Sequence, residues 1–119
     1  MIDTSKVDIR KDHVLEALQR HVGRENGVHM RDLVGRILNT VLVTEAHERK
    51  VRELITDLRN DGHHICAHPG SGYYMAANAK ELEDTCRFLL ERSQSTVDQV
   101  CRMRGAFAID LYQQVGLSR

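Results

Sequence analysis

The chain contains no tryptophan and few aromatic residues of any kind, with two Phe and three Tyr among 119 residues. Aliphatic side chains must therefore form the core. Pro69 is the only proline and no segment is of low complexity, which argues against flexible linkers. The chain also lacks an apolar run long enough to cross a membrane, and Met1–Lys6 lacks the pattern of a secretory signal peptide.

An excess of charge of either sign is absent as well. Lysine plus arginine and aspartate plus glutamate number 17 each, and the two signs balance both in residues 1–76 and in residues 77–119. A strongly basic chain would point to nucleic acid, and this one does not. Most of the basic residues are arginine, however, which suits bidentate contacts with phosphate and guanine. Composition leaves the class of partner open.

The three cysteines, Cys66, Cys86 and Cys101, are odd in number and widely spaced. In a chain without an export signal this predicts reduced thiols in the cytoplasm, buried as small apolar residues. At this length the chain has room for one compact domain and an appendage, but not for two ordinary domains.

Apolar residues at helical spacing predict three helices in the first half of the chain. The first runs from about residue 11 to residue 21, with Gly23 placed to end it, and the second covers Met30–Leu38. A third begins after Thr44, a good N-cap, and ends at Gly62. Their expected buried stripes are Val14, Leu15, Leu18 and Val22, then Leu33, Val34, Ile37 and Leu38, then Val51, Leu54, Ile55 and Leu58.

A β-hairpin is predicted next, with strands over residues 64–68 and 73–76 around the turn Pro69–Gly72. Alternation places Ile65, Ala67, Tyr73 and Met75 on one face and His64, Cys66, His68 and Tyr74 on the other. Asn78 is placed to cap a final segment that has a helical pattern almost to the end of the chain.

Between the first two helices, Gly27-Val28-His29-Met30 is predicted to form a turn and a very short extended piece. This order of helix, short strand, helix, helix and hairpin resembles a winged helix-turn-helix domain. Residues 49–62 and 64–75 carry the likeness, since a basic third helix ends in Gly and leads into an apolar strand, a turn, and then Gly72-Tyr73. The pattern resembles the N-terminal DNA-binding domain of the biotin-operon repressor, and more closely the small winged-helix proteins of bacteriophages and prophages. It covers roughly residues 11–76. The connection Asn39–Val43 departs from it by lacking the Gly of tight helix-turn-helix turns.

The resemblance implies an α+β fold with a winged-helix domain over residues 8–76. The helical spacing of apolar residues after Asn78 predicts a long C-terminal helix or helical hairpin over residues 77–119. The implied function is sequence-specific binding of double-stranded DNA in a bacterial host's cytoplasm or nucleoid. The protein would act as a transcriptional regulator or a phage replication accessory factor. A recognition helix reads bases near its N-terminus, so Arg49 and Arg52 are expected to contact base edges. The other expected DNA contacts are Thr44, His47, Lys50, Arg31, His64, His68 and Ser71.

The C-terminal segment carries an apolar stripe that needs a covering partner. Either the helix breaks near Ser93–Thr96 or Gly105 and folds back, or it packs against a second copy of the chain. We expect a homodimer, with the stripe formed by Leu82, Cys86, Leu89, Val97, Val100, Phe107 and Leu111.

Other functions have weaker support. A protein-interaction module of winged-helix shape is the main alternative, because the charges balance. No nucleophile elbow or carboxylate pair stands out, so we expect no enzyme and no cofactor. The strand rise separates His64 from His68 by about 13 Å, so with Cys66 they form no good metal site and none is expected.

Overall fold

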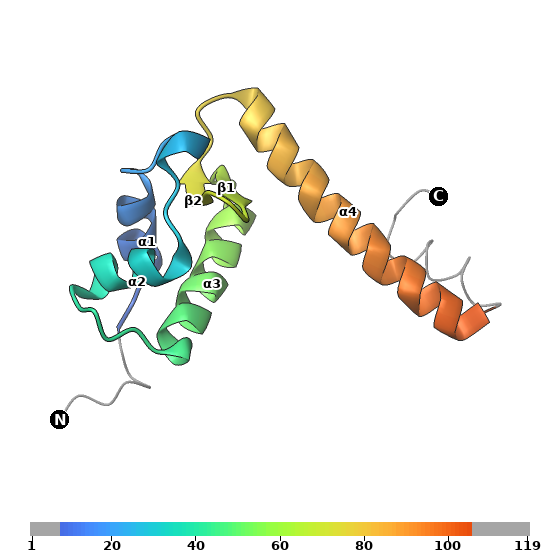
Figure 1. Ribbon diagram of the computed structural model, residues 1–119, viewed down its shortest axis with the longest axis horizontal. Coiled ribbons are helices and arrows are strands. Elements are labelled where there is room, and N and C mark those ends of the chain that lie inside the picture. The colour runs from blue at the N-terminus through green and yellow to red at the C-terminus, as the bar shows by residue number, and fades with distance from the viewer. Residues whose placement is uncertain (1–7, 106–119) are drawn as a thin grey trace. The chain divides into compact units, whose positions relative to one another are not determined.

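The computed structural model describes residues 8–105 of the chain. This part is α+β, with helices and a two-stranded antiparallel hairpin followed by a long C-terminal helix (Figure 1). Its elements are α1 (Lys11–Leu18), the short 3-10 helix η2 (Arg24–Asn26), α2 (Met30–Leu38), α3 (Glu45–Asn60), β1 (Ile65–His68), β2 (Gly72–Met75) and α4 (Ala79–Arg104). By its contacts the chain divides after Leu82 into two units.

The core of the first unit is aliphatic, as the scarcity of aromatic residues requires. The bounds predicted for the second helix are those of α2, and the apolar stripe predicted for the third helix is fully buried in α3. Gly62, the second residue after α3, has a φ of 98°, which confirms the prediction that it helps to end this helix. The largest fully buried side chains are Leu18, Leu33, Ile55, Val14, Val34, Val51 and Cys66.

The first helix is shorter than predicted, because it ends at Leu18 instead of His21. The next residues leave the helical path to pair with β2: the His21 carbonyl accepts from Met75 N–H at 2.8 Å, and Gly23 N–H donates to the Met75 carbonyl at 2.8 Å. Val22 is consequently half exposed and lies outside the buried stripe. Tertiary backbone pairing has overridden a helical pattern here.

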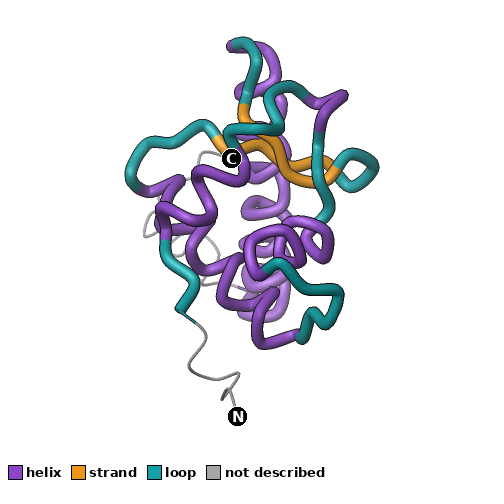
Figure 2. Tube along the Cα trace, turned by 90° about the vertical axis from the view of Figure 1, so that its left-hand side faces the viewer, coloured by secondary structure: helices purple, strands orange, loops and turns teal. Residues whose placement is uncertain are grey.

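Strand β2 is therefore hydrogen-bonded along both edges. On one side it pairs with β1 in a register that places Ile65 opposite Met75. Figure 2 shows the two strands side by side. On the other side Val28 and Tyr73 exchange two backbone hydrogen bonds of 2.8 Å. The short extended piece predicted around Val28 is thus confirmed as a bridge to β2.

The alternation predicted for the hairpin is confirmed, but its second face is not a solvent face. Cys66 pairs with Tyr74, and both side chains are buried. The Cys66 thiol donates to the Glu81 carbonyl in the first turn of α4, at 3.6 Å. The start of α4 therefore helps to cover this face, which the strand pattern alone does not reveal.

The connection between α2 and α3 has an ordered turn although it lacks the expected Gly. Asn39 takes the left-handed conformation with a φ of 53°, which Asn tolerates better than most residues. Thr40 N–H then donates to the Gly35 carbonyl at 3.0 Å. Gly35 is needed inside α2, because a Cβ there would lie 2.9 Å from the Thr40 carbonyl oxygen.

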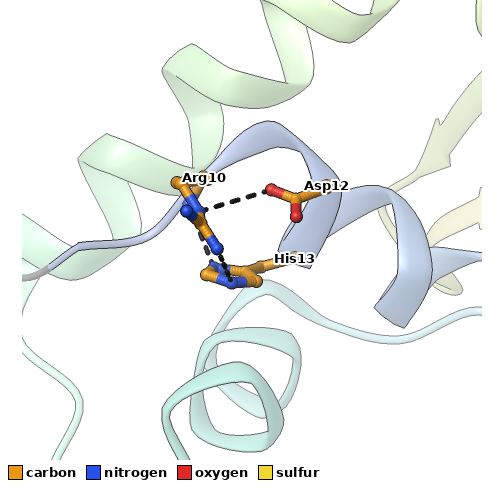
Figure 3. Close-up of polar contacts among 3 residues, drawn as sticks. All are labelled: Arg10, Asp12 and His13. Atoms are coloured by element: carbon orange, nitrogen blue, oxygen red, sulfur yellow. Dashed lines mark hydrogen bonds and ion pairs between the residues drawn. The ribbon is translucent and has the colours of Figure 1, made fainter.

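The start of α1 is shaped by a histidine at its third position (Figure 3). Arg10 N–H donates to Nδ1 of His13 at 3.2 Å, and the Arg10 guanidinium lies 3.6 Å from the Asp12 carboxylate. Next along the helix, Lys11 donates to the Asp61 carboxylate at 2.7 Å, which joins α1 to the end of α3. This contact lowers the pKa of Asp61 and raises that of Lys11.

Helix α4 begins as predicted, with the Asn78 side chain accepting from Glu81 N–H at 2.9 Å. It continues without a break through Ser93–Thr96, where the Thr96 hydroxyl donates to the Arg92 carbonyl. It ends at Arg104, before Gly105 with a φ of 63°. Of the two break points considered, only the one at Gly105 ends the described helix.

Gly72 allows the close approach between β2 and Val28. We predict that Gly72→Ala destabilises the chain more than Gly62→Ala does, in urea unfolding followed by circular dichroism. Both glycines have positive φ, so each substitution costs about 1–2 kcal/mol of unfolding free energy. Only a Cβ at Gly72 would meet backbone, 2.4 Å from the Val28 carbonyl oxygen, which adds about 1–3 kcal/mol. Equal losses would contradict this account.

Candidate nucleic-acid interface

The N-terminus of α3 is closed by a reciprocal pair of hydrogen bonds. The Thr44 hydroxyl accepts from His47 N–H at 3.2 Å, and Nδ1 of His47 accepts from Thr44 N–H at 3.3 Å. A histidine thus does what Glu or Gln does in the usual capping box. The prediction that Thr44 caps this helix is confirmed.

The same contacts correct the expectation for His47. Its side chain is only 6% exposed, so it does not lie on the outer surface beside Arg49. The ring turns back toward Thr44 to complete the cap, and its Nε2 is buried without a hydrogen-bond partner among the described residues. The pattern of charged and apolar residues gave no sign of this, because histidine fits either side of a helix.

The outward face of α3 is mixed in charge. Arg49, Lys50 and Arg52 are exposed, as the apolar stripe on the opposite side requires. Glu45 and Glu53 are exposed on the same helix, so the basic residues form no continuous positive strip. The helix therefore offers discrete cationic side chains on a surface that carries no strong field of its own.

Arg52 has an acidic neighbour one turn away. Its Nη2 lies 3.6 Å from Oε1 of Glu48, in the i,i+4 arrangement. The Arg52 side chain is 56% exposed and the Glu48 side chain 20%. Ion pairs at the surface contribute about 0–1 kcal/mol of stability, so a stronger acceptor can displace Glu48. The Arg49 guanidinium, by contrast, makes no hydrogen bond or ion pair within residues 8–105, so it is available to a ligand.

Arg31 lies near the α2–α3 connection. It is exposed on α2 and lines a groove together with Asp32, Gly35 and Arg36 of the same helix. The groove is also lined by four residues that follow α2, namely Asn39, Thr40, Val41 and Val43. The structure thus places Arg31 beside the chain that leads into the capped end of α3.

The hairpin residues that were expected to contact DNA are only partly accessible to a ligand. His64 is exposed, while His68 and Ser71 are half-buried. Nδ1 of His68 accepts from Gly70 N–H at 3.0 Å, and the Arg24 guanidinium lies against its Nε2. Within residues 8–105 no hydrogen bond or ion pair joins these three residues to the basic residues of α3.

Sequence reasoning did not single out Arg24. It reaches His68 because residues 21–23 pair with β2, and no local signal in the sequence reports that pairing. A second basic cleft, between α1 and α2, was not expected either. There Arg36 donates to Nε2 of His21 at 2.8 Å, and Nδ1 of His21 donates to the Asn26 carbonyl at 2.8 Å. The cleft is lined by His13, Glu16, Ala17, Arg20, His21, Arg36 and Ile37.

The comparisons with protein-family models, curated proteins and solved structures give no match for this chain. In the described part, no cluster of His, Cys, Asp and Glu side chains has the makings of a metal site. No described helix is long and apolar enough to span a lipid bilayer.

The cap of α3 gives a testable expectation. Thr44→Ala should lower the free energy of unfolding by about 1 kcal/mol, because the His47 N–H loses its acceptor. Thr56→Ala is the matched control, since that exposed hydroxyl only donates to the Arg52 carbonyl within the helix. Alanine favours helix over threonine, so this variant should be as stable as the wild type or more so. Urea unfolding measures both, and equal destabilisation by the two substitutions would contradict the role of Thr44.

Proposed function

We propose that this chain is a winged helix-turn-helix protein that binds double-stranded DNA sequence-specifically, as a transcriptional regulator or phage replication accessory factor in a bacterial cytoplasm. The observation that carries the proposal is the outward pair Arg49 and Arg52 in the first half of a capped helix. Residues three apart lie on one helical face, at a spacing that matches neighbouring base edges or phosphates. A protein of this kind performs no catalysis and needs no cofactor.

The element order supports the winged-helix part of the proposal. Three helices precede a hairpin, and the isolated bridge at Val28 places a short extended piece of chain beside β2. The α2–α3 turn with Asn39 replaces the Gly-containing turn of the usual motif. In this arrangement α3 would enter the major groove, and His64, His68 and Ser71 of the hairpin would contact the DNA backbone.

The mixed charge of α3 determines how strongly the chain should bind DNA that lacks its preferred sequence. Glu45, Glu48 and Glu53 oppose the phosphates, so binding that does not depend on sequence should be weak. When Arg52 meets a guanine or a phosphate, it exchanges the Glu48 carboxylate for a better acceptor. Specific contacts must then supply most of the affinity.

The mixed charge also supports the alternative, a protein-interaction module that keeps this fold and presents α3 to another protein. The specific observation is the Glu48–Arg52 ion pair, which neutralises one of the two central arginines in the free chain. A partner with its own acidic and basic side chains would match such a face better than a uniformly negative duplex does.

Fluorescence anisotropy with duplex fragments from the source genome, at two salt concentrations, tests the DNA proposal. The wild type should bind a preferred fragment, and more weakly at the higher salt. Arg49→Ala/Arg52→Ala should weaken that binding by about 100-fold, because each bidentate base contact contributes about 1–3 kcal/mol. The matched control, Arg87→Ala/Arg102→Ala, removes the same charge from exposed positions of α4 and should retain the preference. No binding by the folded wild type at low salt would favour the protein-interaction module.

We also propose that the chain forms a homodimer through α4. Cys86, Leu89 and Met103 are exposed on this helix, and Leu82 and Val100 are half-buried. Together with Ser93 and Thr96 they follow the alternating spacing of four and three residues that coiled-coil seams use. The exposed seam residues Cys86, Leu89 and Met103 are therefore available to a second copy of the chain.

Part of the dimer stripe expected from the sequence is excluded from the seam. Val97 is only 8% exposed in the single chain, and the neighbouring Cys101 only 7%. A side chain that is already buried contributes little new apolar burial on association. Phe107 and Leu111 lie outside the described residues.

Sedimentation measurements at micromolar concentration test the dimer. The wild type should sediment as a dimer and Leu89→Glu as a monomer, because the charge would be buried at the seam. Phe88→Glu is the matched control: Phe88 is equally exposed but lies about 100° around the helix, beneath the Arg92 guanidinium. It should remain dimeric. A monomeric wild type would exclude the seam, whereas a dimer would predict a palindromic DNA site with half-sites whole turns apart.

A further inference from the structure

Val41 is the most exposed large apolar residue in residues 8–105, at 94%, and its neighbour Leu42 is exposed at 77%. They are consecutive, and they lie in the connection between α2 and α3. The next residue, Val43, packs against the core in the ordinary way. The DNA contacts proposed above use only polar and charged groups, so they leave this pair without a role.

The exposure of the pair is fixed by hydrogen bonds on either side of it. Thr40 N–H donates to the Gly35 carbonyl at 3.0 Å, and Leu42 N–H donates to the Thr40 hydroxyl at 3.0 Å. Two residues after Leu42, Thr44 is tied into the cap of α3. The backbone therefore holds both side chains outward at defined positions.

The pair lies among the residues proposed to contact DNA. Val41 lines the same groove as Arg31 and Arg36. On the other side, Leu42 precedes the N-cap Thr44, and Arg49 follows in the second turn of the helix. Cations thus stand on α2 and on α3, with the apolar pair in the segment that connects them.

We propose that Val41 and Leu42 contact the C5-methyl groups of thymines in the major groove, and so select thymine at positions next to those read by Arg49. This inference rests on the proposed DNA binding. The thymine methyl is the apolar group that base pairs present in the major groove, and small apolar side chains recognise it by direct contact.

The size of the patch favours DNA over a protein partner. A stable protein–protein interface buries about 800 Å² on each side, with an apolar centre of many residues. Here two apolar side chains stand beside a groove lined by two arginines and an aspartate. A methyl contact needs only one side chain, and the neighbouring arginines suit phosphates.

The test removes the methyl groups and nothing else. A preferred duplex is first selected from random sequence with the wild-type chain. Each thymine in that duplex is then replaced in turn by deoxyuridine, which lacks only the C5-methyl. Replacement at one or two positions should weaken wild-type binding by about fourfold each, the effect of one buried methyl. Val41→Ser/Leu42→Ser should bind the thymine and deoxyuridine duplexes equally, and its exposed positions should leave the fold intact in circular dichroism.

Met103→Ser provides the matched control, because it removes a side chain of similar exposure from α4. That variant should still distinguish thymine from deoxyuridine. If the wild type binds both duplexes equally, or the double variant still discriminates, the inference is overturned while DNA binding stands. The first of these results, with DNA binding unchanged in the double variant, would show that the pair makes no contact with DNA. If no duplex is enriched, the proposed function fails and this inference fails with it.

Discussion

Backbone pairing along both edges of β2 is the constraint on which the first unit depends. One edge joins β1, and the other joins the chain between α1 and α2 at Val28 and at residues 21–23. This strand therefore ties the helical part to the hairpin through hydrogen bonds of near-ideal length. The close approach at Val28 is open only to glycine at position 72, because a side chain there would displace the Val28 carbonyl.

The surfaces offered to a partner lie away from these paired strand edges. Helix α3 buries its apolar stripe and turns Arg49 and Arg52 outward. Both α1 and α3 begin with a histidine whose Nδ1 accepts the N-cap amide, at His13 and at His47. A ring nitrogen that accepts a hydrogen bond carries no proton of its own. Nδ1 of His13 and Nδ1 of His47 therefore cannot donate to a ligand.

Local signals predicted much of the fold from the sequence. The bounds of α2, the Thr44 cap, the Gly62 stop and the Asn78 cap each follow from a residue and its immediate neighbours. The misplaced features depend on contacts between distant segments. The end of α1 is set by Met75, far along the chain, and Arg24 reaches His68 for the same reason. The sequence could name Arg49 and Arg52 as outward residues, but it could not show the burial of His47.

Glu81 accepts hydrogen bonds from three separate segments, which affects how the first unit unfolds locally. Its carboxylate accepts from the backbone amides of Arg24 and Ala77, at 3.1 and 2.9 Å, and its carbonyl accepts from the Cys66 thiol. Fraying of the first turn of α4 would strip acceptors from η2, the hairpin and the loop after it at the same moment. Local unfolding of these three segments is therefore coupled, and amide exchange there should report one cooperative opening instead of three separate ones.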